Sequence, residues 1–176
     1  MKKLINKTII LSLFVALTGC NDWLDVSPKA DMKAEDLFGT EAGFRDALVG
    51  VYALMCGTNS YGRDLTYGYL DVLAQYYNSP LKTTSSGYEH NFKNAAEYKY
   101  TEKTEESRIS SIWSNHFSAV ANINQAMLFI DENKGVFTSP EVHDVYKGEF
   151  LALRAFLHFD ILRLFAPSAA MNNNKG

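Results

Sequence analysis

Two long stretches in the second half of the chain carry apolar residues at helical spacing. They cover residues 109–130 and 142–164, and apolar side chains recur every three or four positions along both. This period is typical of an α-helix that turns one face to a core, and each run is far longer than a strand. Ser139-Pro140 is a good start for the second helix, and Pro167 ends it. Asn133-Lys134-Gly135 suits the end of the first, so the two stretches predict an antiparallel hairpin.

Shorter signals predict two further helices ahead of this hairpin. Thr40 is a suitable N-cap, and the apolar residues from Phe44 to Met55 fall on one helical face. Residues 65–77 repeat the pattern, with Gly68 as a weak point. Residues 78–107 have the Ser, Thr, Asn and Gly content of a long loop, with short strand-like pieces expected around Tyr98 and Tyr100. The predicted fold class is therefore all-α, with antiparallel helical hairpins and one long loop.

The start of the chain has the pattern of a bacterial lipoprotein export signal. Three Lys precede an apolar run at residues 9–17, and the segment ends in Leu17-Thr18-Gly19-Cys20. The stretch from Leu4 to Gly19 is sixteen residues long, whereas a membrane-spanning helix needs about 20 apolar residues. We therefore expect residues 1–19 to be removed and Cys20 to carry the fatty acyl anchor. The alternative is an ordinary signal peptide with an incidental cysteine.

Charge and cysteine content narrow the function classes. Residues 1–19 hold three Lys and no acid, so their removal takes the formal net charge from −3 to −6. An acidic chain is a poor partner for nucleic acid, which requires clustered Lys and Arg. Lipidation of Cys20 leaves Cys56 alone, which we expect to be a small buried thiol at a helix end rather than a reactive site. The four His residues show no metal-binding spacing, and no cofactor is predicted.

Regions outside the helices have simpler predictions. Residues 20–39 are expected to form an extended tether that leads from the lipid to the folded body, and Trp23 and Leu24 of this tether are expected to dock on that body. Residues 40–167 form the helical body, and residues 168–176 a frayed or truncated tail.

Aromatic residues beside polar ones mark the candidate ligand-binding positions. A pyranose lays its C–H face on an aromatic ring, while its hydroxyls require amides, hydroxyls and charges around the rim. The candidates at the loop entrance and within the loop are Tyr76, Tyr77, Asn78, Tyr88, His90, Asn91 and Phe92. The alternative is that these aromatics pack the loop. Trp113 is predicted to be core, and Tyr61, Tyr67 and Tyr69 are left open.

Charged residues in the last helix are predicted to be structural. Glu149, Arg154, Asp160 and Arg163 lie among apolar residues, where an unpaired charge is costly. We therefore expect ion pairs, with Asp160 and Arg163 at neighbour spacing. No acid, base and nucleophile converge in the sequence, so a catalytic role is not predicted.

Three stretches together resemble the SusD/RagB family, the glycan-binding surface lipoproteins of Bacteroidota. They are residues 17–28 with Cys20, Trp23-Leu24-Asp25 and Pro28; residues 40–55, TEAGFRDALVGVYALM; and residues 148–165, GEFLALRAFLHFDILRLF. The matching positions of the last stretch are Glu149, Leu153, Arg154, Ala155, Phe159, Arg163 and Phe165. The chain departs from the family in having Ala166-Pro167 after this helix. The resemblance implies a tetratricopeptide-like scaffold of which this chain holds the opening hairpins, and so a fragment of a longer protein.

The resemblance also implies a function. It is that of a non-catalytic, surface-exposed lipoprotein of the outer membrane that holds oligosaccharides or similar nutrients for a SusC-like TonB-dependent transporter. One alternative is a structural or assembly lipoprotein that binds a protein through its hairpins. Another is an anchored glycan hydrolase, which requires two carboxylates about 5–9.5 Å apart. If partner helices are missing, the last helix should leave apolar side chains exposed.

Overall fold

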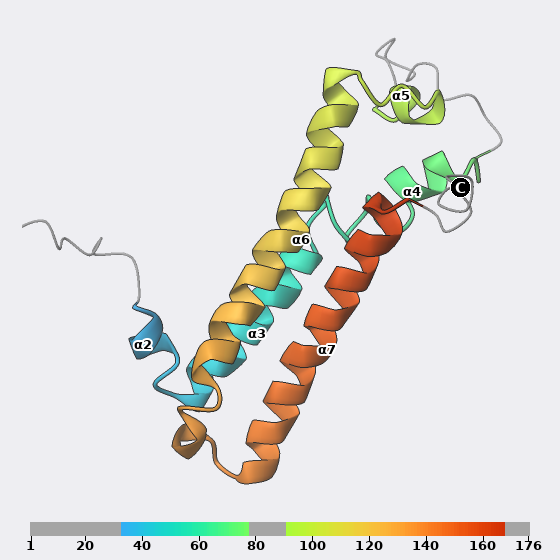
Figure 1. Cartoon of the computed structure of the whole chain (residues 1–176). Coiled ribbons are helices and arrows are strands. Elements are labelled where there is room, and N and C mark those ends of the chain that lie inside the picture. Colours follow the sequence, from blue (N-terminus) through green and yellow to red (C-terminus); the bar gives the residue numbers. More distant parts are fainter. Residues whose placement is uncertain (1–32, 78–90, 168–176) are drawn as a thin grey trace, which may run out of the picture. The chain divides into compact units, whose positions relative to one another are not determined.

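The computed structural model describes residues 33–77 and 91–167. The chain divides into two units, Met1–Lys33 and Ala34–Gly176, and all the described helices belong to the second. Its elements are α2 (Ala34–Leu37), α3 (Glu41–Met55), α4 (Tyr69–Leu73), α5 (Lys93–Ala96), α6 (Lys103–Phe129), the 3-10 helix η1 (Lys134–Val136) and α7 (Pro140–Phe165) (Figure 1). The described residues contain helices and turns and no strand, which confirms the all-α prediction. None of these helices is both long and apolar enough to span a membrane.

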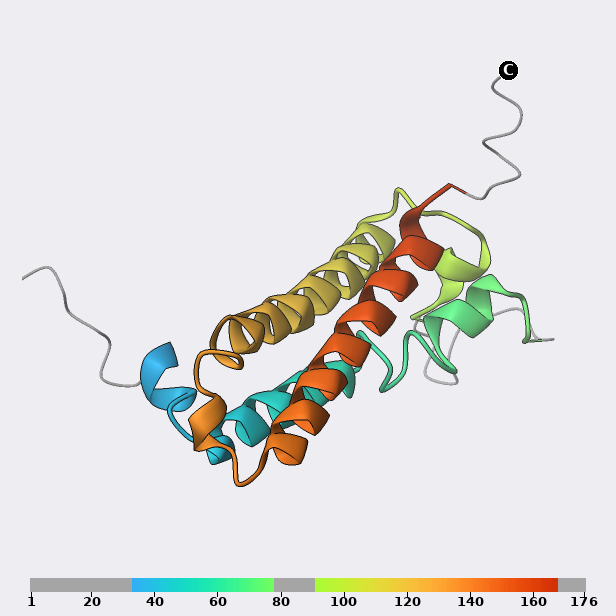
Figure 2. The same ribbon diagram turned by 60° about the horizontal axis from the view of Figure 1, so that its bottom comes forward.

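Three long helices build the body of this unit. α6 packs against both α3 and α7, and it runs in the opposite direction to α7, with η1 at the turn between them (Figures 1 and 2). The core lies between these helices, and its largest fully buried side chains are Phe44, Ile123, Ile130, Phe150 and Leu157. A smaller apolar cluster joins α4 and α5 to the first half of α6 through Leu65, Tyr69, Val72, Ala95 and Ile112. This second cluster places the short helices beside the start of α6.

Side-chain caps fix the starts of α3 and α7. The Thr40 hydroxyl accepts a hydrogen bond of 3.1 Å from the backbone N–H of Gly43. The Ser139 hydroxyl likewise accepts from the N–H of Val142 at 3.4 Å, and Pro140 occupies the first turn. Each bond satisfies a backbone donor that the first helical turn leaves without a partner. Both predicted helix starts are therefore confirmed.

The segment between α3 and α6 differs from its prediction. The second helix covers only Tyr69–Leu73, because turns occupy the chain up to Gly68. Gly68 has non-helical backbone angles, φ −102° and ψ −106°, so the helix begins only after it. The chain is also closely packed here, since a Cβ atom at Gly68 would lie 2.9 Å from the carbonyl oxygen of Arg63. The strand-like pieces are wrong as well. Tyr98 has a left-handed φ of 55° in a turn, and α6 already begins at Lys103.

The tether prediction fails over its last residues. Residues 34–37 form one helical turn, and Phe38 is buried. The Phe38 ring packs 5.0 Å from Phe44 and 5.2 Å from Phe129. This aromatic contact draws the chain onto the core before α3 begins. Trp23 and Leu24 lie outside the described residues, as do Cys20 and residues 168–176.

Two side chains predicted to be buried are exposed. Trp113 is 44% exposed because the buried face of α6 runs through Ile112, His116 and Ala119, one position away around the helix. Its indole instead packs at the edge of the α6–α7 hairpin, 4.9 Å from the Phe165 ring. Cys56 does lie at the end of α3, as predicted, but its thiol is exposed.

Candidate ligand-binding site

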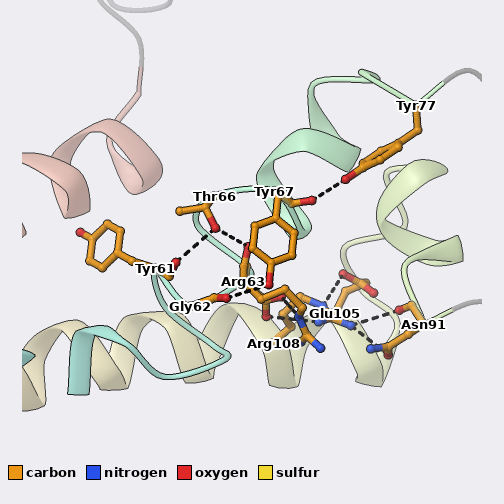
Figure 3. A network of polar contacts seen from close by, with 10 residues as sticks. Tyr61, Gly62, Arg63, Thr66, Tyr67, Tyr77, Asn91, Glu105 and Arg108 are labelled. Carbon is orange, nitrogen blue, oxygen red and sulfur yellow. Dashed lines mark hydrogen bonds and ion pairs between the residues drawn. The ribbon is translucent and has the colours of Figure 1, made fainter. Parts of the chain in front are cut away.

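A buried guanidinium organises the end of the molecule where α4, α5 and the start of α6 meet (Figure 3). Arg108 of α6 is 8% exposed, and its Nη1 lies 3.3 Å from Oδ2 of Asp64, whose side chain is completely buried. Arg63 reaches the other oxygen of the same carboxylate at 2.8 Å. From its Nη2, Arg108 also donates to the backbone oxygen and the side-chain Oδ1 of Asn91, at 3.1 Å each. We call Arg63, Asp64, Asn91, Glu105 and Arg108 the Arg108 cluster.

Aromatic rings cover the guanidinium groups of this cluster. The guanidinium carbon of Arg108 lies 4.5 Å from the centre of the Phe92 ring and 5.6 Å from that of Tyr69. The Arg63 guanidinium lies 5.4 Å from the same Phe92 ring. Such stacking suits the planar, weakly hydrated arginine head and keeps it in place away from water. Phe92 is thus part of the packing around Arg108.

Glu105 is the least satisfied member of the cluster. Its side chain is fully buried, and its Oε2 lies 3.6 Å from Nε of Arg108, an ion-pair distance too long for a hydrogen bond. Within the described residues, neither carboxylate oxygen has a hydrogen-bond partner. Burial raises the pKa of Glu105 above its usual value, and the positive charge of Arg108 opposes this only in part. Burial also raises the pKa of Tyr69 to about 12.

Two contacts tie down the chain on either side of residues 78–90. On one side the Tyr77 hydroxyl donates to the backbone oxygen of Tyr67, and the Tyr67 hydroxyl donates to that of Gly62 at 3.0 Å (Figure 3). On the other side Arg108 holds Asn91. The backbone that enters this segment and the backbone that leaves it are therefore both fixed to the same end of the molecule.

The predicted site residues fall into three groups. Tyr76 and Tyr77 are 76% and 48% exposed, and Tyr67, left open by the sequence, is 63% exposed beside Tyr77. These three tyrosines form what we call the tyrosine rim. Asn91 and Phe92 are engaged by the Arg108 cluster. Asn78, Tyr88 and His90 lie outside the described residues.

The sequence analysis missed Asp64, Glu105 and Arg108 as organising residues. A signal was present, because Glu105, Arg108 and Ile112 are three and four positions apart and so share one helical face. Asp64 lies in a turn and gives no such periodic signal.

A second polar group joins three parts of the helical body. The Tyr61 hydroxyl donates to Oδ2 of Asp160 at 2.6 Å, and Arg163 donates to the other oxygen at 2.6 Å. The latter contact confirms the predicted Asp160–Arg163 pair. Tyr61 Oη also lies 3.2 Å from Nε2 of His116, whose Nδ1 must carry a proton because it faces the carbonyl oxygen of Ile112 at 2.9 Å. Burial and the Asp160 contact raise the pKa of Tyr61.

Glu149 and Arg154, the other two α7 residues predicted to form ion pairs, instead have neutral hydrogen-bond partners within the described residues. The Tyr52 hydroxyl donates to Oε1 of Glu149 at 2.6 Å, and Arg154 donates to Oδ1 of Asn124 at 3.2 Å. These charges therefore connect α7 to α3 and α6 by single hydrogen bonds, which differs from the ion pairs predicted. No group of three or more His, Cys, Asp or Glu in the described ranges is placed to hold a metal ion.

The described residues form an all-helical unit that exposes aromatic rings at the end that holds the Arg108 cluster. Comparison with known proteins supplies the family. The SusD-like family, described as starch-binding and associating with the outer membrane, matches residues 22–175, and the chain belongs to it. SusD-like protein P2 of Formosa agariphila is 28% identical over 162 residues, which are 90% of this chain and 29% of that relative. The chain thus spans less than a third of the relative's length. No solved structure gives a significant match.

Proposed function

We propose that this chain is the amino-terminal part of a non-catalytic lipoprotein that binds oligosaccharides and passes them to a SusC-like TonB-dependent transporter. Cys20 would carry the lipid, and the helical body would stand on the outer surface of the outer membrane. Membership of a family associated with the outer membrane supports this location. The lipoprotein pattern of residues 1–20 supports the anchor.

The tyrosine rim is the observation that best supports a carbohydrate ligand. Tyr67, Tyr76 and Tyr77 expose large parts of their rings, and Tyr67 and Tyr77 are held by hydrogen bonds to backbone oxygens. A tyrosine ring fixed in this way offers a flat apolar surface with little entropy left to lose when a sugar stacks on it. The hydrogen-bonded rings of Tyr67 and Tyr77 therefore support a role in stacking against sugars rather than a role in packing alone.

Affinity electrophoresis in gels containing soluble starch tests this role. Replacing both Tyr76 and Tyr77 by Ala should weaken retention by about fivefold or more, because each stacked ring contributes about 0.5–1.5 kcal/mol. Tyr52→Ala is the matched control, since it removes an exposed tyrosine from α3 and should leave retention unchanged. Far-UV circular dichroism should show unchanged helix content in all variants. Equal retention of the double variant and the wild type would refute the rim as the binding surface.

A second function, assembly with another protein, is favoured by the outer face of α7. Phe156, Phe159 and Leu162 are 45%, 57% and 60% exposed, although they alternate with the buried Leu153, Leu157 and Asp160 along the same helix. A helix that is apolar on both sides is normally covered on both. If Phe159→Asp abolishes outer-membrane complexes while the tyrosine variants leave starch retention unchanged, assembly is the better description.

A further inference from the structure

Two adjoining hollows lie where α4, α6 and the end of α7 come together. The outer hollow has a volume of about 370 Å³ and is lined by Tyr100, Glu106, Ile109, Ser110, Trp113 and Phe165. The inner hollow, of about 230 Å³, shares Tyr100, Ile109 and Phe165 with the outer one and adds Tyr69, Leu70, Leu73, Ile112 and Leu164. We call the two together the α6–α7 groove. None of the three tyrosines of the rim lines the α6–α7 groove, so the groove and the rim are made of different residues.

The outer hollow combines aromatic rings with polar side chains. Trp113 and Tyr100 are 44% and 45% exposed, and the indole is fixed by a perpendicular ring contact of 4.9 Å with Phe165. Glu106 and Ser110, both exposed, supply a carboxylate and a hydroxyl on the same stretch of α6. Held aromatic surfaces with hydrogen-bonding groups at their edge match the two sides of a sugar ring.

The inner hollow has a different chemistry. Apart from its tyrosines and Phe165, its walls are the aliphatic side chains of Leu70, Leu73, Ile109, Ile112 and Leu164. A cavity of about 150 Å³ lined by Leu, Ile and Phe is large enough to bind benzene. The inner hollow, at about 230 Å³, therefore has room for a group built on one phenyl ring.

Tyr69 supplies the inner hollow with a hydroxyl group that can donate a hydrogen bond. It is 4% exposed, and within the described residues its hydroxyl makes no hydrogen bond. Its ring is held beneath the Arg108 guanidinium at 5.6 Å. Within the described residues, the Tyr69 oxygen is not one of the fully buried polar atoms that lack a partner, so it keeps contact with solvent and can donate to an acceptor inside the groove.

We propose that the α6–α7 groove binds a sugar that carries an aromatic acyl ester. The sugar ring lies on Trp113 in the outer hollow, the aryl group fills the inner hollow, and the Tyr69 hydroxyl donates to the ester carbonyl. An unsubstituted sugar would leave the aliphatic walls and the Tyr69 donor unused, and a purely apolar ligand would leave Glu106 and Ser110 unused. The inference rests on the proposed function for the glycan class and adds the substituent and the place where it binds.

Trp113 makes the groove directly observable. The chain has two tryptophans, so the full chain with Trp23→Phe, purified in detergent, reports on Trp113 alone. Titration with 6-O-benzoylmaltose should change the Trp113 fluorescence, and the affinity should be at least about tenfold higher than for maltose. Tyr69→Phe should weaken benzoylmaltose binding about fivefold, the loss expected for one hydrogen bond, and leave maltose binding unchanged. Leu73→Phe, which fills the inner hollow, should remove the preference for the ester.

Controls separate this proposal from the function proposed above. Phe159→Ala removes an exposed aromatic of α7 that lines neither hollow, and it should leave the benzoylmaltose affinity unchanged. Equal affinities for benzoylmaltose and maltose, or a Trp113 signal that does not respond, would overturn the groove proposal. If starch retention still depends on Tyr76 and Tyr77, the proposed function survives that result. If starch is not retained at all but benzoylmaltose alters the Trp113 signal, the groove stands and the rim fails.

Discussion

Replacing Arg108 by Met removes the guanidinium while keeping much of the side-chain stem. Among the described residues, the fully buried Asp64 then keeps Arg63 as its one ion-pair partner, whose side chain is 30% exposed, and both acceptors of Asn91 lose the Arg108 donor. Breaking a buried charge pair from one side typically costs about 3–5 kcal/mol, because the remaining charge stays buried. We expect a loss of this size in the free energy of unfolding. Arg63→Met, the matched control at the edge of the same cluster, should cost about 1 kcal/mol or less.

The loss should depend on pH through Glu105. Burial raises the pKa of this carboxyl in the folded protein, so its contribution to stability is fully present below its unfolded pKa and is lost as the pH rises through the folded pKa. Arg108 opposes the shift, and its removal should make the buried negative charge still less favourable. The cost of Arg108→Met should therefore be larger at pH 7 than at pH 4. Adding Glu105→Gln should restore part of the stability at pH 7.

Urea unfolding followed by far-UV circular dichroism at both pH values measures these differences. The four proteins needed are the wild type, Arg63→Met, Arg108→Met and Arg108→Met with Glu105→Gln. Equal midpoints for the two single arginine variants would refute the view that Arg108 holds this end of the molecule together. A cost of Arg108→Met that is the same at pH 4 and pH 7 would refute the part assigned to Glu105.

Three further substitutions test other parts of the structure. A Cβ atom at Gly43 would lie 1.6 Å from the carbonyl oxygen of Leu37, so Gly43→Ala must push α2 away from α3 and should lower stability by about 1–3 kcal/mol in thermal melts. Cys20→Ser should abolish incorporation of radiolabelled palmitate and release the protein from the envelope fraction; full retention there would contradict the proposed anchor. Phe159, 57% exposed on α7, should contribute to the binding of hydrophobic dyes, and Phe159→Asp should reduce their fluorescence by a clear margin.

The parts of the fold that depend on neighbouring residues in the sequence were predictable. Thr40 and Ser139 cap helices through atoms three residues away, and the long apolar periods of α6 and α7 require only that one face be buried. The short helix α4 was overestimated because its start depends on how closely Gly68 approaches Arg63. That approach is a result of tertiary packing, which local propensity does not report.

The site was harder to predict than the fold for the same reason. Tyr76 and Tyr77 could be selected because exposed aromatics next to a polar loop form a local pattern. The role of Arg108 could not, since its partners Asp64 and Asn91 are 44 and 17 residues away. Trp113 was assigned to the core because an apolar period of three to four residues does not distinguish a buried position from its neighbour on the same helix.

The anchoring of Tyr77 and Asn91 has an evolutionary consequence. Both anchors use groups outside residues 78–90, so neither hydrogen bond depends on the side chains that stand between them. Lengthening a closed loop is inexpensive, at about 0.6 kcal/mol for each doubling. Mutations, insertions and deletions in this interval should therefore leave these two anchoring bonds in place. Related chains can therefore differ in this interval and acquire different ligand preferences while they keep the same helical fold.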